Sequence, residues 1–169
     1  RLNHHDQLIV HLIPHTHIDA GWLKNMDEYY SGTNRLVQKD AGAVRDIFDT
    51  VIEELQVNLT RKFAIAEMGY FSMWYNKQDE KVKEAVKNLI HTGQLEFING
   101  GWSANDEASP SYNDILNNMM IGHEFLKKEF DYTPKIGWNV DVFGHSDVAT
   151  RLYSEMGFEA IFFSRLDYY

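Results

Sequence analysis

The sequence predicts an α/β domain with a mainly parallel sheet, in which strands and helices alternate along the chain. Short apolar runs suited to buried strands alternate with stretches whose apolar residues recur at helical spacing. This alternation is typical of folds with parallel strands. Polar and aromatic residues collect directly after each run, where such folds place their sites. No repeat or linker interrupts residues 1–169, so we expect a single domain.

Five segments are predicted to be strands, because each is a short aliphatic or aromatic run that ends at a polar or glycine-containing turn. They are residues 8–14, 63–66, 95–98, 136–140 and 160–163. The carboxyl ends of parallel strands meet at one edge of a sheet. The polar residues that follow these strands are therefore expected to lie together.

Four helices are predicted between the strands, over residues 40–55, 82–90, 109–126 and 146–157. Ser109 followed by Pro110 is typical of a helix start, and Ser146 is a second candidate cap. Gly93 and Gly157 stand where helices commonly end. Residues 24–39 carry no regular pattern and are expected to be irregular.

Composition excludes several classes of protein. The net charge of −9 argues against nucleic-acid binding, and the absence of cysteine excludes disulfides and cysteine-type zinc sites. No apolar run reaches the roughly 20 residues of a membrane span. The chain begins at Arg1 without a visible signal peptide, so we expect a processed product or an excised piece. A glycosylation sequon at Asn58 fits a secretory route.

The first candidate site follows the first predicted strand. His15, His17 and Asp19 stand at alternate positions, and residues two apart in an extended chain point the same way. Imidazole and carboxylate groups are ligands of zinc and of neighbouring divalent metals. A polar turn after a buried strand is the alternative. Three potential ligands on one side favour a metal site.

Asp141 is the second candidate, because it directly follows the strand at 136–140. At the same sheet edge it could join His17 and Asp19 on one metal and leave positions open for water or sugar hydroxyls. His145 is interpreted as a supporting residue rather than a ligand.

Other side chains near these ligands could bind a sugar or simply pack. Trp22, Trp102 and Phe143 are aromatic residues on the surrounding loops. Asp106 and Glu107 are either acceptors for ligand histidines or surface charges.

These residues resemble the motifs of a known family, the glycoside hydrolase family 38 α-mannosidases. The resemblance covers the chain from about Leu8 to its last residue, and four segments carry it in order: His15-Thr16-His17-Ile18-Asp19-Ala20-Gly21-Trp22, Gly100-Gly101-Trp102 with Asp106-Glu107-Ala108, Asp141-Val142-Phe143-Gly144-His145-Ser146, and Phe162-Phe163-Ser164-Arg165-Leu166-Asp167-Tyr168. The last segment is similar to the lysosomal, acid-acting branch. Val142 and Ala20 depart from the usual pattern beside functional positions.

The resemblance implies a zinc-dependent, retaining exo-α-mannosidase on a partial barrel-like glycoside hydrolase domain. Its zinc ligands fall on His17, Asp19 and Asp141, and its nucleophile also falls on Asp141. Its aromatic sugar contacts fall on Trp22 and Phe143, and its substrate-side arginine on Arg165; the substrate would be a mannose-containing oligosaccharide of the N-glycan type. Family members are longer, and the general acid and a further histidine ligand are not found here. We therefore expect the amino-terminal part of a catalytic domain, inactive without the remainder of its chain, in a lysosome or vacuole or secreted.

Two alternatives remain open. A His-x-His motif after a first strand also occurs in metal-dependent amidohydrolases and deacetylases, although the segments around Asp141 and Arg165 favour a mannosidase. A non-catalytic sugar-binding relic is the third interpretation, and the presence of His17, Asp19 and Asp141 together argues against it.

Overall fold

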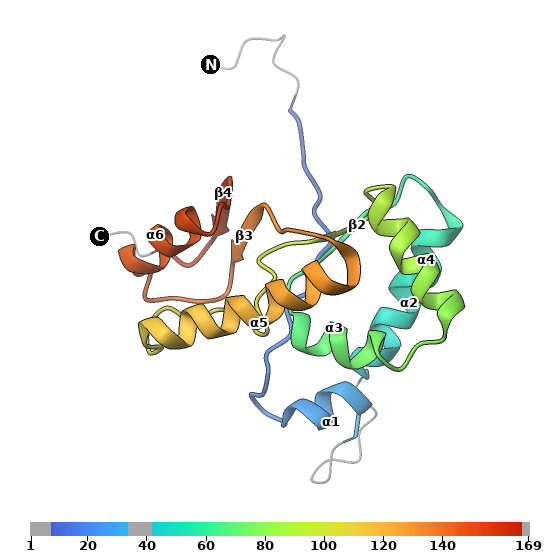
Figure 1. Cartoon of the computed structure of the whole chain (residues 1–169), viewed down its shortest axis with the longest axis horizontal. Coiled ribbons are helices and arrows are strands. Elements are labelled where there is room, and N and C mark those ends of the chain that lie inside the picture. Colours follow the sequence, from blue (N-terminus) through green and yellow to red (C-terminus); the bar gives the residue numbers. More distant parts are fainter. Residues whose placement is uncertain (1–7, 34–41, 167–169) are drawn as a thin grey trace.

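The computed structural model describes residues 8–33 and 42–166 of the chain (Figure 1). Its elements, in order, are α1 (Met26–Ser31), α2 (Val44–Val57), β1 (Phe63–Ile65), α3 (Met68–Tyr75), α4 (Glu80–His91), β2 (Leu95–Phe97), α5 (Tyr112–Phe130), β3 (Ile136–Asn139), α6 (Asp147–Glu155) and β4 (Ala160–Phe163). The molecule is a small mixed α/β domain, as predicted. No helix among the described residues is both long enough and apolar enough to cross a bilayer.

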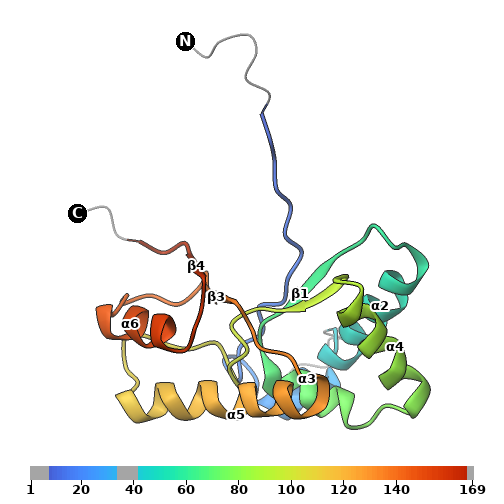
Figure 2. The same cartoon turned by 45° about the horizontal axis from the view of Figure 1, so that its top comes forward.

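The strands are parallel, but they form two small sheets rather than one. β1 pairs with β2, with Phe63 opposite Leu95, and β3 pairs with β4, with Ile136 opposite Ala160. The amide of Asn99 donates to the carbonyl of Ile136 at 2.7 Å, which joins the end of β2 to the start of β3. Both views place the strands above α5, with α2 and α4 at one end and α6 at the other (Figures 1 and 2). The described residues form no closed barrel.

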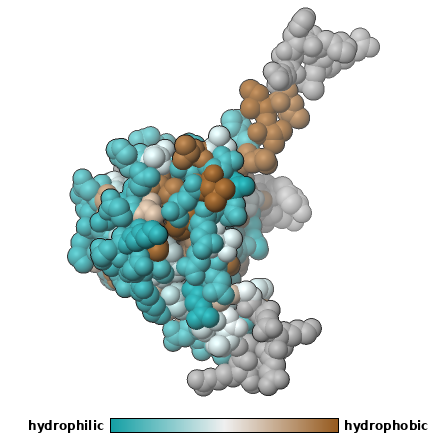
Figure 3. All heavy atoms as spheres, turned by 90° about the vertical axis from the view of Figure 1, so that its right-hand side faces the viewer, coloured by the Kyte–Doolittle hydropathy of each residue, from teal (hydrophilic) through white to brown (hydrophobic). Residues whose placement is uncertain are grey.

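The predicted strand at residues 8–14 is wrong. Only an isolated parallel bridge, His15 with Ala64, joins this part of the chain to β1. β1 has three residues, so it offers backbone partners only to the end of the segment, where the amide of Ala64 donates to Pro14. The preceding side chains project into solvent; Leu8 is 86% exposed, and the apolar atoms gather on a projecting arm (Figure 3).

All four predicted helices are present, and three of them start at other residues than predicted. α2 begins at Val44, and residue 40 lies outside the described residues. The N-cap of α5 lies two residues later than predicted, because Ser111 rather than Ser109 forms a capping box with Asp114. Ser146 is the N-cap of α6 as predicted, although its side chain makes no capping hydrogen bond.

Two helices were not predicted. α1 has a capping box between Asn25 and Glu28 and ends at Gly32, whose φ of 75° favours glycine. α3 is buried on nearly every side, because seven of its eight residues are buried. A helix that is apolar all round has no polar face, so its sequence lacks the helical period on which the prediction depends.

The main core lies between α2, α3, α4, α5 and the β1–β2 sheet. Phe71 of α3 is at its centre and contacts the rings of Phe48, Trp74 and Phe97. Full burial of one such side chain contributes about 1.5–3 kcal/mol. A smaller cluster fills the space between the sheets, formed by Ala64, Ala66, Ile98 and Trp138. The core thus fixes α3 directly beneath the end of β1.

Candidate functional site

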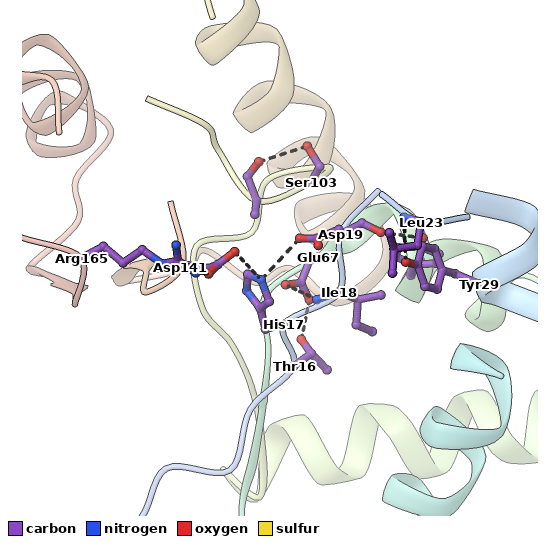
Figure 4. A network of polar contacts seen from close by, with 12 residues as sticks. Thr16, His17, Ile18, Asp19, Leu23, Tyr29, Glu67, Ser103, Asp141 and Arg165 are labelled. Atoms are coloured by element: carbon purple, nitrogen blue, oxygen red, sulfur yellow. Dashed lines mark hydrogen bonds and ion pairs between the residues drawn. The ribbon is translucent and has the colours of Figure 1, made fainter. Parts of the chain in front are cut away.

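The site lies where the predicted motifs meet at the carboxyl ends of β1 and β3. His17 Nε2 lies 3.4 Å from Asp19 Oδ1 and 3.2 Å from Asp141 Oδ2 (Figure 4). One ligand atom from each residue lies within 4.8 Å of the other two. The structure therefore brings together the three side chains that were predicted as a set, although 122 residues separate Asp19 from Asp141 in the sequence.

His15 does not join this cluster. Its ring packs edge-on against Trp138 at 4.6 Å, and its Nδ1 lies 2.7 Å from the carbonyl oxygen of Ile13. His15 thus lies outside the cluster, although the spacing of the sequence made it a candidate ligand beside His17 and Asp19. The chain is in no regular strand here, so strict alternation of side chains does not hold.

The cluster has the chemistry of a divalent-metal site. One imidazole nitrogen and two carboxylate oxygens suit zinc. Bonds of about 2.0–2.1 Å in a tetrahedron separate ligand atoms by roughly 3.3 Å, and the two measured distances from His17 Nε2 are 3.4 and 3.2 Å. All three side chains are partly exposed, so a bound ion would keep positions open toward solvent. The three residues therefore fit a zinc ion.

A buried carboxylate holds the segment that carries His17. Thr16 Oγ1 donates to Glu67 Oε2 at 2.6 Å, and the amide of Ile18 donates to Glu67 Oε1 at 3.1 Å (Figure 4). Glu67 is 2% exposed, and this burial raises its pKa from the ordinary value, against the opposing effect of the hydrogen bond from Thr16. The first motif is therefore anchored in the interior at the junction of β1 and α3.

One turn further along α3, a second side chain reaches the same segment. The hydroxyl of Tyr70 donates to the carbonyl oxygen of Asp19 at 2.8 Å. Burial raises the pKa of Tyr70 to about 12, so its hydroxyl remains a donor at neutral and acidic pH.

The second motif docks on the start of the same helix. The amides of Met68 and Gly69 donate to the carbonyl oxygens of Gly101 and Trp102 at 3.0 and 2.8 Å. A Cβ on Gly69 would lie 2.8 Å from the Trp102 oxygen, so only glycine permits this approach. The start of α3 therefore links the first and second motifs.

Polar contacts hold Asp141 and the loop that follows it. Asp141 Oδ1 accepts from Arg165 Nη2, which leaves Oδ2 near His17. Glu107 accepts from Asn139 Nδ2 at 2.6 Å and from the amide of Ser146 at 2.8 Å, so it ties the end of β3 to the start of α6.

His145 supports this region without contacting the cluster. Its Nε2 lies 2.8 Å from the carbonyl oxygen of Arg165, and its Nδ1 lies 3.8 Å from Glu107 Oε2. These contacts agree with its interpretation as a supporting residue.

The side chains predicted to contact a sugar differ in position. Phe143 is 57% exposed, and the guanidinium of Arg165 lies 5.8 Å from its ring centroid, beside Asp141. Trp22 is 75% exposed on the turn before α1. Phe143 and Arg165 are thus close to the cluster, whereas Trp22 belongs to the other loop.

The cluster of His17, Asp19 and Asp141 does not lie in a large cavity. A surface hollow of about 580 Å³ lies between α4 and α5, where Lys127 and Lys128 pair with neighbouring acids. The cavity beneath the cluster measures about 10 Å³ and is lined by both His17 and Asp141. The residues that line the hollow include no group of three side chains that could hold one metal ion, so the site is identified by the ligand atoms of His17, Asp19 and Asp141.

The sequence pointed to the ligands but not to the groups that hold them. Glu67 directly follows the predicted strand at residues 63–66, and neither Glu67 nor Tyr70 belongs to a motif of the sequence. Glu107 was one of two possible acceptors, and the structure shows that it binds Asn139 and Ser146. A lone glutamate after a strand is weak evidence in a sequence, because only the fold shows which amide it meets.

Similarity to known proteins agrees with this geometry. The family model described as the glycosyl hydrolases family 38 N-terminal domain matches residues 7–169. A probable alpha-mannosidase of Arabidopsis thaliana is 46% identical over 163 residues, which cover 96% of this chain and 16% of that protein. The lysosomal alpha-mannosidase of Felis catus is 44% identical over 167 residues, covering 98% of this chain and 16% of that protein.

A solved structure has the same fold. The alpha-mannosidase from Enterococcus faecalis V583 superposes with a TM-score of 0.70 at 22% identity, over 89% of this chain and 16% of that one. The chain thus spans about 16% of the length of the curated relatives that it matches. On its matched domain and its sequence identity to these relatives, the chain belongs to glycoside hydrolase family 38.

Proposed function

We propose that this chain is the amino-terminal part of the catalytic domain of a zinc-dependent, retaining exo-α-mannosidase. The observation that carries the proposal is the cluster of His17, Asp19 and Asp141 in a chain of family 38. The remainder of the protein would complete the barrel-like domain and supply the general acid and a further zinc ligand. The substrate would be terminal α-linked mannose on an N-glycan-type oligosaccharide.

His17, Asp19 and Asp141 would hold one zinc ion. When bound, zinc supplies a Lewis acid that can bind sugar hydroxyls and favour the distorted ring of the transition state. The donor set supports this assignment, because the nitrogen lies near both carboxylates and all three side chains reach solvent.

Asp141 would act as the nucleophile. In retaining hydrolysis a carboxylate attacks the anomeric carbon while the glycosidic bond breaks and the general acid protonates the leaving oxygen. Water then cleaves the glycosyl-enzyme ester and releases the sugar. The contact between Asp141 Oδ1 and Arg165 fixes the direction of the carboxylate. Phe143 and Trp22 would pack against the apolar faces of the sugar, with Phe143 nearer to the attacking group.

Several similar proteins are named lysosomal alpha-mannosidases, from Dictyostelium discoideum, Felis catus, Bos taurus and Mus musculus. We place this protein in a lysosomal or vacuolar compartment on that ground. Family membership also favours a glycosidase over a metal-dependent amidohydrolase or deacetylase.

The test is the change Asp141→Asn in the full-length protein, assayed on an aryl α-mannoside. The expected result is a nearly complete loss of turnover, because the amide is a poor nucleophile, together with weaker zinc binding. Asp147→Asn is the matched control, since Asp147 is an exposed carboxylate at the start of α6 that accepts a hydrogen bond from the amide of Val148 and is not part of the cluster. Near-normal turnover by the Asp141 variant would refute the nucleophile. Absence of mannosidase activity in the wild-type protein would favour a sugar-binding relic.

A further inference from the structure

We infer that Glu67 is a positioning residue, whose buried carboxylate holds the backbone between His17 and Asp19 in the geometry of the metal cluster. Its two oxygens accept from two donors on one short segment, Thr16 Oγ1 and the amide of Ile18. In Figure 4 the carboxylate of Glu67 lies between Thr16 and Asp19, beside Ile18, and Arg165 lies on the other side of His17. Glu67 is not itself a ligand in the cluster.

Apolar packing in the core does not compensate for the burial of the Glu67 carboxylate. An ionisable group that leaves water loses hydration worth several kcal/mol unless hydrogen bonds or an opposite charge replace it. No lysine or arginine of the described chain forms an ion pair with Glu67. The compensation comes from the hydrogen bonds of the first motif, so the carboxylate and the segment depend on each other.

The chain of contacts begins at Ala66, directly after β1, and ends between the ligands. The amide of Ala66 donates to Thr16 Oγ1 at 2.9 Å, and the same hydroxyl donates to Glu67. Glu67 then accepts from the amide of Ile18. Because Ile18 stands between the two ligands, fixing its peptide plane fixes the directions in which His17 and Asp19 leave the backbone.

A second contact holds the far side of the segment. Tyr70, three residues after Glu67, donates to the carbonyl oxygen of Asp19. Both residues lie at the junction of β1 and α3, which the main core fixes. The junction therefore holds the ligand pair from both sides, and Glu67 makes the contact nearest to His17.

The consequence for metal binding rests on the proposed zinc site. Groups that orient metal ligands typically change metal affinity by about 10–100-fold when they are removed. Glu67→Gln and Thr16→Val should therefore each weaken zinc binding by about tenfold or more. The two donors meet different oxygens of Glu67, and glutamine would replace one of these oxygens with an NH2 group that donates instead of accepting. Valine has the shape of threonine without its hydroxyl.

The experiment measures zinc affinity of the full-length variants by competition with a chromogenic chelator. It also records the visible spectrum of the cobalt-substituted proteins, which reports ligand geometry. Thr16→Ser keeps the hydroxyl and should restore the wild-type affinity and spectrum. Glu96→Gln, at an exposed glutamate of β2, is the matched control for loss of a carboxylate. Wild-type affinity and spectrum in Glu67→Gln and Thr16→Val would overturn the inference, even if their melting temperatures fall.

A further measurement separates this inference from the proposed function. If the wild-type protein binds no zinc, the proposed function fails. The positioning role of Glu67 is then tested by amide hydrogen exchange at Ile18 in the metal-free protein. Faster exchange at Ile18 in Glu67→Gln and Thr16→Val than in Thr16→Ser supports positioning by Glu67. Equal exchange in all of them contradicts it.

Discussion

The two halves of the candidate site are held in different ways. The half that carries His17 and Asp19 rests on Glu67, which is 2% exposed and lies at the junction of β1 and α3. The half that carries Asp141 rests on Arg165, whose side chain is 55% exposed, in the loop after β4. One half is thus anchored in the core, and the other depends on polar contacts between loops.

The difference has a functional consequence. Regions with few buried contacts open more readily than the core, so the Asp141 loop is expected to open at a lower free energy than the segment of His17. A zinc ion that bound both halves would favour the state in which they lie together. The rigid half would then set the position of the ion, and the looser half would complete the site on binding.

Gly122→Ala should have the largest effect, because it disturbs the loop that lies between the two halves. A Cβ at Gly122 in α5 would lie 1.9 Å from the carbonyl oxygen of Gly100, a contact that only a backbone shift can relieve. We expect a loss of about 3 kcal/mol or more in the free energy of unfolding, measured by denaturant titration. Gly42→Ala is the control, since its Cβ would meet nothing within 4 Å. A variant as stable as wild type would show that the loop does not support the domain.

Glu107→Gln should affect the Asp141 half alone. Its carboxylate accepts from Asn139 and Ser146, and an amide would place a donor against one of these donors. We expect a loss of about 2 kcal/mol and faster hydrogen exchange over residues 140–146, with unchanged exchange over residues 15–19. Asp106→Asn, at the exposed neighbouring carboxylate, is the control. If hydrogen exchange became equally faster over residues 15–19 and 140–146, the two halves would not be held independently.

The contacts made by Gly122 and Glu107 show which features cannot be predicted from the sequence. Histidine and aspartate after strands have a chemical signature, which made them candidate ligands, and the family resemblance selected His17 rather than His15. Neither Gly122 nor Gly100 has one, because the need for glycine at 122 arises only when α5 packs on the loop at 100. Contacts between distant segments depend on the packed fold, which periodicity does not describe.

Tyr153→Phe should change the alkaline stability of the Asp141 half. Burial raises the pKa of Tyr153 to about 12 from its ordinary value of 10.0, against the opposing effect of its hydrogen bond with Asn139. Its neutral form is therefore favoured in the folded state, and this stability is present below pH 10 and lost as the pH rises through about 12. At pH 11 the loss is about 1.4 kcal/mol, and the phenylalanine variant should lack it.

The measurement for Tyr153 is the free energy of unfolding between pH 9 and pH 12. Tyr112→Phe, at an exposed tyrosine of α5, is the control and should keep the full decrease of the wild type. A Tyr153→Phe variant with the same pH slope as wild type would show that this buried phenol does not titrate with unfolding.

Trp22→Ala should have the smallest effect on stability. The side chain is exposed, so we expect a change within about 0.5 kcal/mol. If Trp22 contacts the sugar, KM for an aryl α-mannoside should rise while zinc affinity stays the same. Unchanged KM would remove Trp22 from the substrate site and leave Phe143 as the aromatic contact of the looser half.

The fold itself was predicted unevenly, for physical reasons. The amphipathic helices α2, α4, α5 and α6 have one polar face, and this face made them visible in the sequence. α3 has none, because it is buried, and it is the helix that holds the first half of the site. The apolar run at residues 8–14 resembles a strand, but it pairs with β1 only at its end, and pairing is not encoded in the run itself. Positions 167 and 168 of the fourth motif lie outside the described residues.

The central claim is that the two halves share one zinc ion, and anomalous diffraction at the zinc edge tests it most directly. Crystals of the full-length protein grown with zinc should show one peak bonded to His17 Nε2 and to carboxylate oxygens of Asp19 and Asp141, at roughly 2.0–2.2 Å. A peak bonded to only one half, or no peak at the cluster, would contradict the claim.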